Sequence, residues 1–357
     1  MATAQRQHSE AEIIDRFQRF IPDPDRIDEV LGDEPGKTLA EAVGARSNDR
    51  GPSEDDAEAE ARQHAFDRTG EAARRAVGKI RRDGRDANLT RLERDGAEAI
   101  VELFGRPAIL VQDGHFMPPP HPWEKLEAQR EAIEKTLQSV GRIEVSGHPA
   151  LDWVGTGFLV AEDVVITNRH VAKEFARQSA DSQWVFEADM TPRVDFAEEI
   201  GGSQPREFQI TELIGVSDSF DMAFLRAQKS GPAGEIPPPL PLAPAAAVQE
   251  GREVYVIGYP ASDSRRNDPE EQRRIFANIF DVKRLQPGEI SGIEPAGSLF
   301  LHDCSTLGGN SGSCVVDLET HAILGLHFSG RFLVANKGIA LATCDDPLIE
   351  KVGLEFG

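Results

Sequence analysis

Cysteine and long apolar runs are both scarce in this chain, and each shortage excludes a class of protein. Only Cys304, Cys314 and Cys344 occur in 357 residues. An odd number of cysteines in so long a chain argues against a disulfide scaffold and favours small buried side chains. No run approaches the length of a membrane-spanning helix. The Cys and His spacings fit no zinc pattern, so we expect no metal and no cofactor.

Positive charge is also in short supply. The chain has 39 Lys and Arg residues against 61 Asp and Glu residues, a formal net charge of −22. Such a chain repels nucleic acid and anionic membranes, so we expect neither as a partner. The first ten residues contain no apolar stretch like that of a secretory signal. If this is the native start, the sequence predicts a cytoplasmic protein.

The first 117 residues are predicted to be a mostly helical region. Segments 11–20 and 71–104 carry apolar residues at roughly helical spacing, with expected breaks at Gly78, Gly84 and Gly96. Residues 51–60 are acidic and poor in apolar side chains, which favours a loop or a disordered linker. Residues 107–111 form a short apolar run typical of a strand.

Residues 118–141 are expected to form a proline spacer and one amphipathic helix. The apolar stripe of this helix over 123–140 is interrupted only by Arg130, and Gly141 would end it. The stripe consists of Trp123, Leu126, Ile133, Leu137 and Val140.

From Arg142 onward, strand patterns replace helical ones. Apolar runs at 158–160 and 164–167 flank a turn at Glu162 and Asp163, and further runs occupy 254–260, 313–316 and 323–328. Many short apolar runs with Gly and Pro between them favour an all-β barrel or sandwich. Segment 262–274 is highly charged and is expected to be a surface loop, and 346–356 a closing helix.

Three motifs carry the chemistry. Gly308–Ser313 places Ser311 between glycines, a turn that presents a hydroxyl nucleophile and aims backbone N–H groups at a carbonyl oxygen. Segment 166–172 contains His170, and segment 219–225 contains Asp221. Each residue alone has a plain structural explanation, and Asp218 lies close to Asp221. The three motifs together favour catalysis.

The chain order His170, Asp221, Ser311 is that of the chymotrypsin arrangement. The three residues are 51 and 90 positions apart. Residues from about 142 to 350 therefore resemble a trypsin-like serine protease domain of the bacterial type that includes glutamyl endopeptidases, and we expect the domain to span 142–357. The resemblance implies a mainly β fold of two six-stranded barrels, about 142–240 and 241–345. Residues 1–140 show no such resemblance.

The resemblance also implies the role of each residue. Ser311 would attack the peptide carbonyl, His170 would act as base and then acid, and Asp221 would orient the imidazole. The N–H groups of Gly309 and Ser311 would form the oxyanion hole. Asn310 stands where trypsins that are activated by a newly freed N-terminus carry an aspartate, which puts that activation in doubt.

A primary specificity for Glu, or Asp, is a further hypothesis from the resemblance. In glutamyl endopeptidases a histidine in a Gly-x-His motif and a threonine five residues before the nucleophile bind the substrate carboxylate. His327 and Thr306 match these positions, and Ser329 completes the predicted substrate-binding set. Their alternative role is that of ordinary strand residues.

The sequence thus predicts a serine endopeptidase that acts on protein or peptide substrates. Its N-terminal region would be a propeptide, an inhibitory arm or a partner-binding module, on which an activating protease or regulatory protein acts. A simple stabilising extension is the plain alternative. By analogy, this architecture suits a bacterial defence or stress effector. The competing class is a catalytically silent protease fold used for binding; an esterase is disfavoured because Ser313 replaces the second glycine of the nucleophile elbow.

Overall fold

A computed structural model describes residues 14, 72, 75–94, 97, 105–202, 204–262, 275–331 and 335–357. The chain divides into two compact units. The first contains residues 1–105, 120–123 and 273–277, and the second contains the remainder. The predicted helix at 11–20, the linker at 51–60, the break at Gly96 and the charged loop at 262–274 lie wholly or mostly outside the described residues.

The first unit contains a helix over residues 75–83, followed by the 3-10 turn η2 (Gly84–Asp86). Gly84 breaks the helix as predicted, with φ of 57°, whereas Gly78 lies inside it and the break predicted there is wrong. Thr90 and Glu93 form a reciprocal capping box, with Thr90 N donating to Glu93 Oε2 over 2.8 Å and Glu93 N to Thr90 Oγ1 over 3.3 Å. A hydrogen bond from Lys79 is the main cause that lowers the pKa of Glu93 to about 2.

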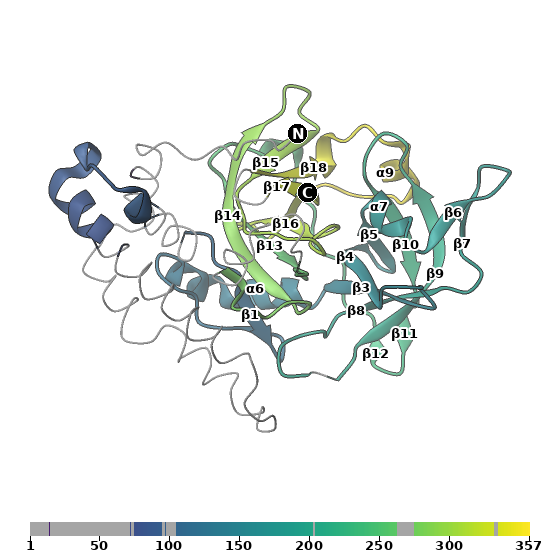
Figure 1. The fold of residues 1–357 in the computed structure, drawn as a ribbon. Coiled ribbons are helices and arrows are strands. Elements are labelled where there is room, and N and C mark those ends of the chain that lie inside the picture. Colours follow the sequence, from purple (N-terminus) through teal and green to yellow (C-terminus); the bar gives the residue numbers. More distant parts are fainter. Residues whose placement is uncertain are drawn as a thin grey trace, which may run out of the picture. The chain divides into compact units, whose positions relative to one another are not determined.

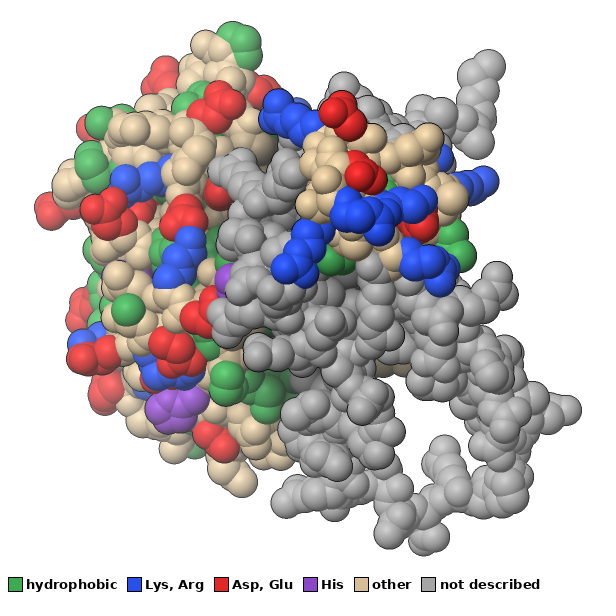
Figure 2. All heavy atoms as spheres, turned by 90° about the vertical axis from the view of Figure 1, so that its left-hand side faces the viewer, with side chains coloured by type: hydrophobic (Ala, Val, Ile, Leu, Met, Phe, Trp, Pro, Cys, Tyr) green, Lys and Arg blue, Asp and Glu red, His purple; other side chains and the backbone are tan. Residues whose placement is uncertain are grey.

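The described part of the first unit is basic, although the chain as a whole is acidic. Residues 75–94 contain seven Lys and Arg residues against three Asp and Glu residues. Lys and Arg side chains crowd one visible surface of this part (Figure 2). The exposed arginines are Arg75, Arg81, Arg82, Arg85 and Arg91.

The second unit contains two closed six-stranded antiparallel β-barrels, the fold class that the sequence predicted (Figure 1). The first barrel has the strand order β10-β5-β4-β3-β8-β9. Its apolar interior includes Leu159, Val165, Phe208 and Leu225. Its strands are β3 (Val140–Ser146), β4 (Trp153–Ala161), β5 (Val164–Thr167), β8 (Thr191–Asp195), β9 (Glu207–Val216) and β10 (Ala223–Ala227).

The second barrel has the order β13-β16-β17-β18-β15-β14 and closes through the pairing of β13 with β14. Its strands are β13 (Glu253–Gly258), β14 (Arg284–Ile293), β15 (Leu299–His302), β16 (Cys314–Asp317), β17 (Ile323–Arg331) and β18 (Ala335–Ala340). Short helices and ribbons outside the barrels are α7 (Arg169–Ala172), η4 (Ala245–Ala247), η5 (Leu341–Thr343), β6 (Ala176–Gln178), β7 (Trp184–Phe186), β11 (Ser230–Gly231) and β12 (Gly234–Glu235).

A β-hairpin from the N-terminal side of the chain joins the second barrel. Strand β1 (Ile109–Gln112) pairs with β2 (His115–Phe116) and also with β14, through Ile109 opposite Leu285. The strand predicted at 107–111 is thereby confirmed. Three apolar residues of β1 are buried, so the hairpin is part of the packed unit.

The predicted helix over 123–140 is corrected by the structure. A 3-10 helix, η3 (Glu124–Gln129), leads into α6 (Arg130–Leu137), and Gly141 does not cap a helix. Val140 and Gly141 belong instead to β3, where they pair with Phe158 and Gly157, because closing the first barrel requires a strand there. The apolar stripe is nonetheless buried: no member is more than 2% exposed.

The C-terminal helix is shorter than predicted. It comprises only α9 (Pro347–Lys351), where the Asp346 side chain accepts a hydrogen bond from the N–H of Leu348 over 2.9 Å. Gly353 has φ of 68°, a conformation that ends helices. All three cysteines are free and buried, as expected, and burial raises the pKa of the Cys314 thiol to about 12. None of the helices in the described part of the chain has the length and apolar character needed to span a membrane.

Lys283, just before β14, is a fully buried cation that ties the two barrels together. Its Nζ donates to the carbonyl oxygens of Leu137 over 2.9 Å and Phe196 over 2.6 Å, and lies 3.4 Å from Glu199 Oε1. The other Glu199 oxygen accepts from the N–H of Gly114 over 2.7 Å. Burial lowers the pKa of Lys283 despite its acidic partner.

Replacing Lys283 by Met is therefore expected to lower the free energy of unfolding by about 3–5 kcal/mol, because Glu199 is left as a buried charge without its partner. The measurement is urea-induced unfolding followed by fluorescence. Lys337→Met is the control, since it breaks an exposed pair with Glu294 and should cost at most about 1 kcal/mol. Equal losses in the two variants would contradict this account of Lys283.

Candidate active site

His170 and Asp221 form a doubly hydrogen-bonded pair. Asp221 follows strand β9 and immediately precedes Met222 and β10, while His170 lies in α7 just after β5. The imidazole Nδ1 lies 2.6 Å from Asp221 Oδ2, and the backbone N–H of His170 donates to Asp221 Oδ1 over 2.9 Å. The alternative carboxylate, Asp218, is not bonded to this ring; its backbone carbonyl accepts from Arg169. The structure thus places the predicted base and orienting residue together.

The ionised form of Asp221 is favoured at this position. Desolvation is the largest influence and would raise the pKa of the carboxyl, but the hydrogen bonds and charge of His170, together with the charge of Arg169, outweigh it. The net result is a pKa below the usual value. A carboxylate that stays ionised can hold the imidazole with its proton on Nδ1 and leave Nε2 as the acceptor.

The loop that carries Asp221 is fixed by bonds at both ends. The N–H of Ser217 donates to the carbonyl of Met222 over 2.9 Å, which closes the loop at its base. Asn168 Nδ2 donates to the carbonyl of Asp221 over 2.9 Å. The hydroxyl of Ser217 donates to the Asp346 carboxylate, the same group that caps α9. The C-terminal segment therefore helps to position the carboxylate that orients His170.

Ser311 lies on a turn in which the backbone before and after it adopts conformations that favour glycine. Gly309 and Gly312 have φ of 82° and 90°. A side chain at Gly312 would collide with the carbonyl of Thr156, and one at Gly309 with the Trp153 ring. The Ser311 hydroxyl makes no hydrogen bond to any described residue, so the structure does not join it to His170. Catalytic contacts of this kind often tighten only when substrate binds.

Backbone N–H groups alternate between bonded and free along this turn. The N–H of Asn310 donates to Leu307 over 3.2 Å, and that of Gly312 donates to His327 over 3.0 Å. The N–H groups of Gly309 and Ser311 donate to no described residue. Free N–H groups on either side of a bonded one are what an oxyanion requires. These are the two predicted oxyanion donors.

The predicted specificity residues fall into two separate hydrogen-bonded groups. His327 Nδ1 lies 3.1 Å from Nε2 of His302, and both rings are buried. Thr306 Oγ1 donates to Asn336 Oδ1 over 2.7 Å, while Asn336 Nδ2 donates to the carbonyl of Cys304 over 2.6 Å. Ser329 is exposed on β17.

His302 and Asn336 were missed by the sequence analysis. His302 is fully buried, and burial lowers its pKa to about 3. Its contact with His327 arises because β15 and β17 both flank β18, with His302 opposite Asn336 and His327 opposite Gly338. Alternation along β15 shows only that His302 faces inward, and no local pattern indicates its partner.

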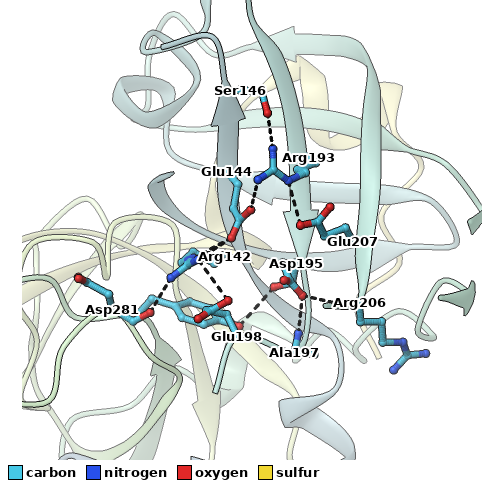
Figure 3. Close-up of polar contacts among 11 residues, drawn as sticks. Arg142, Glu144, Ser146, Arg193, Asp195, Ala197, Glu198, Arg206, Glu207 and Asp281 are labelled. Carbon is cyan, nitrogen blue, oxygen red and sulfur yellow. Dashed lines mark hydrogen bonds and ion pairs between the residues drawn. The ribbon is translucent and has the colours of Figure 1, made fainter. Parts of the chain in front are cut away.

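A charge network around Arg142 borders the site (Figure 3). Arg142 Nη2 bonds Glu144 over 2.6 Å and lies 3.3 Å from Glu198, while Nη1 donates to the carbonyl of Asp281 over 2.8 Å. Its guanidinium stands 5.5 Å from the Trp153 ring centroid. Trp153 also limits the space for a side chain at Gly309. The network therefore supports the predicted oxyanion turn through its contact with Trp153.

The three acidic groups of this network do not make a convincing cation site. Ligand atoms of Glu144, Asp195 and Glu198 lie within 4.8 Å of one another. Glu144, however, is already paired with Arg142 and with Arg193 over 2.5 Å. Asp195 Oδ1 accepts two backbone N–H bonds. We therefore interpret the cluster as a mostly buried network of ion pairs and hydrogen bonds, and assign no metal to it.

Comparison with known proteins agrees with this geometry. Residues 155–326 match the family model of the trypsin-like peptidase domain. The chain is 29% identical over 316 residues to a protein of Lysobacter enzymogenes named as a probable serine protease, covering 78% of this chain and 81% of that one. Because residues 142–357 make up only about 60% of the chain, that similarity extends into the N-terminal region.

More distant relatives cover the second unit only in part. A glutamyl endopeptidase of Staphylococcus aureus is 27% identical over 192 residues, or 51% of this chain and 44% of that protein. The chain thus matches less than half the length of that relative. Among solved structures, a serine endoprotease from Yersinia pestis has 19% identity and a TM-score of 0.40, covering 62% of this chain and 64% of the other. Residues 155–326 are thus a trypsin-like peptidase domain, which is a domain of hydrolases of the serine endopeptidase class.

Proposed function

We propose that the chain hydrolyses peptide bonds through an acyl-enzyme, with Ser311 as nucleophile, His170 as base and Asp221 as orienting carboxylate. The observation that carries the proposal is the pair of N–H groups at Gly309 and Ser311 that donate to no described residue. They belong to the turn of Ser311, and the proposed base, the half-exposed His170, is bonded to a carboxylate. The alternative function, a catalytically silent binding module, would not require these N–H groups or the paired histidine and carboxylate.

The proposed reaction has two steps, formation of the acyl-enzyme and its hydrolysis, and the protons balance in each. Ser311 Oγ attacks the substrate carbonyl while His170 Nε2 takes the hydroxyl proton, and the oxyanion is held by the N–H groups of Gly309 and Ser311. His170 then gives the proton to the leaving amine, and the C–N bond breaks. Water, deprotonated by His170, attacks the ester, and the proton returns to Ser311 as the acid product leaves.

A preference for Glu on the acyl side is supported by the tautomers of the histidine pair. One of His302 Nε2 and His327 Nδ1 must be the donor. His302 Nδ1 has no partner within the described residues, and a bare acceptor is less costly there than an orphaned N–H. His302 Nε2 therefore donates, His327 Nδ1 accepts, and the remaining proton of His327 sits on Nε2, where it can be offered to a carboxylate.

Thr306 contributes less to this proposal than the family pattern suggests. Since Asn336 Nδ2 is the donor to Cys304, Asn336 Oδ1 must be the acceptor from Thr306. The hydroxyl proton of Thr306 is thereby committed, and its oxygen offers only lone pairs to a substrate carboxylate. Recognition of Glu or Asp then rests mainly on His327, with Ser329 as an accessible hydroxyl on the same strand.

Control by the N-terminal region is a further part of the proposal. The exposed arginines of residues 75–94 provide a surface for an acidic regulatory protein or for the acidic part of a substrate. A role in bacterial defence or stress response, and a location in the cytoplasm, remain proposals from architecture and composition. A regulatory role predicts that the activity on long substrates changes when these arginines are replaced by glutamate.

The function is tested by digesting a proteome-derived peptide library and identifying the new termini by mass spectrometry. The full chain should cleave, preferentially after Glu, while Ser311→Ala should not. Cleavage by Ser311→Ala would refute Ser311 as the nucleophile. No cleavage by the unmodified chain under any condition would favour the silent module. Cleavage without a preference for acidic residues would refute the proposed role of His327, but the proposed peptidase activity would stand.

The assignment of Asp221 has a matched control. Asp221→Asn should lower kcat by about 10⁴-fold, because the amide stabilises the imidazole with its proton on the wrong nitrogen. Asp218→Asn should retain activity within about twofold, since that carboxylate makes no bond to His170. Both are measured as initial rates on a peptide taken from the library digest, with circular dichroism to check the fold. Similar losses in both would refute the assignment.

The selectivity for Glu over Gln should not vary with pH between about 5.5 and 8. Burial first, then His302 and His170, lower the pKa of His327 far below its ordinary value, so it stays neutral across this range, while a substrate Glu stays ionised above its pKa of about 4.3. The measurement is the ratio of kcat/KM for paired Glu and Gln peptides. A ratio that falls as pH rises, with a midpoint near 6.5, would mean that His327 is protonated when it binds substrate.

A further inference from the structure

Residues 106–112, which we call the brace, hold the chain segment that leads to the nucleophile turn. The carbonyl of Arg106 accepts a hydrogen bond from Ser305 Oγ over 2.6 Å, and the Arg106 guanidinium pairs with the carboxylate of Asp303. The same carboxylate accepts from the N–H of Glu289 on β14 over 2.7 Å. The segment 303–306 is thus bonded on one side to the brace and on the other to the barrel.

The brace is itself fixed to the barrel beneath it. Ile109 and Leu110 pair with Leu285 and Arg284 on β14. Arg284, which is 2% exposed, donates from Nη1 to the carbonyl of Ala108 over 2.7 Å. A brace anchored on β14 can hold Ser305 and Asp303 at a set position relative to the barrel.

Gln286 extends this arrangement to the catalytic turn. Its Nε2 donates to the carbonyl of Ser305 over 2.6 Å and to Asn310 Oδ1 over 3.3 Å. Gln286 and Asn310 are fully buried, and Ser305 is 7% exposed. Asn310 lies between the two free N–H groups, so a shift of its side chain would turn the peptide planes on either side of it.

Few other bonds hold the Asn310 side chain. Its Nδ2 has no partner within the described residues, and Oδ1 otherwise accepts only a long bond of 3.4 Å from Ser313. Gln286 Oε1 is likewise unpartnered there. Among the described residues, the Gln286–Asn310 bond is therefore one of two bonds to the side chain of the residue before the nucleophile.

We infer that the brace, Ser305 and Gln286 are positioning elements of the active site, so that residues 106–112 are required for activity and are not a removable propeptide. The inference rests on the proposed function, because it concerns the geometry of that same turn. In enzymes that are activated by a freed N-terminus, an aspartate fills the position of Asn310. Here an uncharged chain of bonds, from the carbonyl of Arg106 through Ser305 and Gln286, supplies the support without any cleavage.

The test uses full-length variants and a fluorophosphonate probe, which labels an assembled serine site through its nucleophile and oxyanion donors. Ser305→Ala and Gln286→Met should label about 10- to 100-fold more slowly, since a displacement of about 1 Å can cost that much. The value of kcat should fall with the labelling rate, whereas KM should change by less than about threefold. Ser305→Thr keeps the hydroxyl and should restore most of the rate.

Ser139→Ala is the matched control. Ser139 is buried, as Ser305 is, and its hydroxyl donates to the carbonyl of Pro238 over 2.7 Å but has no bond to the nucleophile turn. It should lose as much stability in urea as Ser305→Ala without slowing the probe. Should Gln286→Met fail to fold, Ser305→Ala still decides the matter, because it removes a single hydroxyl.

The outcomes separate this inference from the proposed function. If the unmodified chain labels and Ser305→Ala and Gln286→Met label as fast as it does, the inference is overturned and the peptidase stands. If Ser139→Ala slows labelling as much as Ser305→Ala, the effect is general destabilisation and the inference again fails. If the unmodified chain neither labels nor cleaves, the proposed function fails first.

Discussion

The arrangement of the site depends on one residue of the first barrel, Thr156, which holds the turn contributed by the second. Its N–H donates to the carbonyl of Ser311 over 2.8 Å, and its hydroxyl donates to the carbonyl of Gly309 over the same distance. These bonds fix the Gly309–Asn310 and Ser311–Gly312 peptide planes, which alternate with the planes that carry the N–H groups of Gly309 and Ser311. Thr156 is in turn fixed by Thr167, whose hydroxyl donates to its carbonyl over 2.7 Å. The turn that carries the proposed oxyanion donors is thus held in part by the barrel that also carries His170.

Hydrogen bonds to the carbonyl groups of the turn require neighbouring residues to lie close to its backbone. This close approach explains why glycine occupies these positions better than a need for flexibility does. A Cβ at Gly312 would meet the carbonyl of Thr156, and one at Gly309 would meet Trp153. Trp153 is backed by Arg142, whose charge is neutralised by Glu144. The ion network around Arg142 and the turn of Ser311 are therefore parts of one support. Glycine loses more backbone entropy on folding than other residues do, so these two glycines cost stability. In return the directions of the N–H groups in the turn are fixed.

The sequence predicted what depends on local pattern. The motifs gave the chain order of His170, Asp221 and Ser311, and apolar runs gave the strands at 164–167 and 323–328. The fold class of two six-stranded barrels was implied by the family resemblance, and it is confirmed. His302, Asn336 and Gln286 were not predictable, because strand register across the second barrel selects their partners. The helix over 123–140 was predicted too long because Val140 fits a helical stripe, and Gly141 a helix end, as well as both fit a strand. Only barrel closure decides between the two.

The proposed recognition of a substrate carboxylate by His327 does not require a buried cation. Protonating either ring of the His302–His327 pair would place a charge among buried groups, which carries a desolvation cost. A neutral ring that donates from Nε2 avoids that cost when the site is empty. Under the proposal it makes a charge-assisted bond only when the substrate supplies the charge. The proposed discrimination consequently depends on how firmly His302 fixes the His327 tautomer, and that in turn depends on the register of β15, β18 and β17.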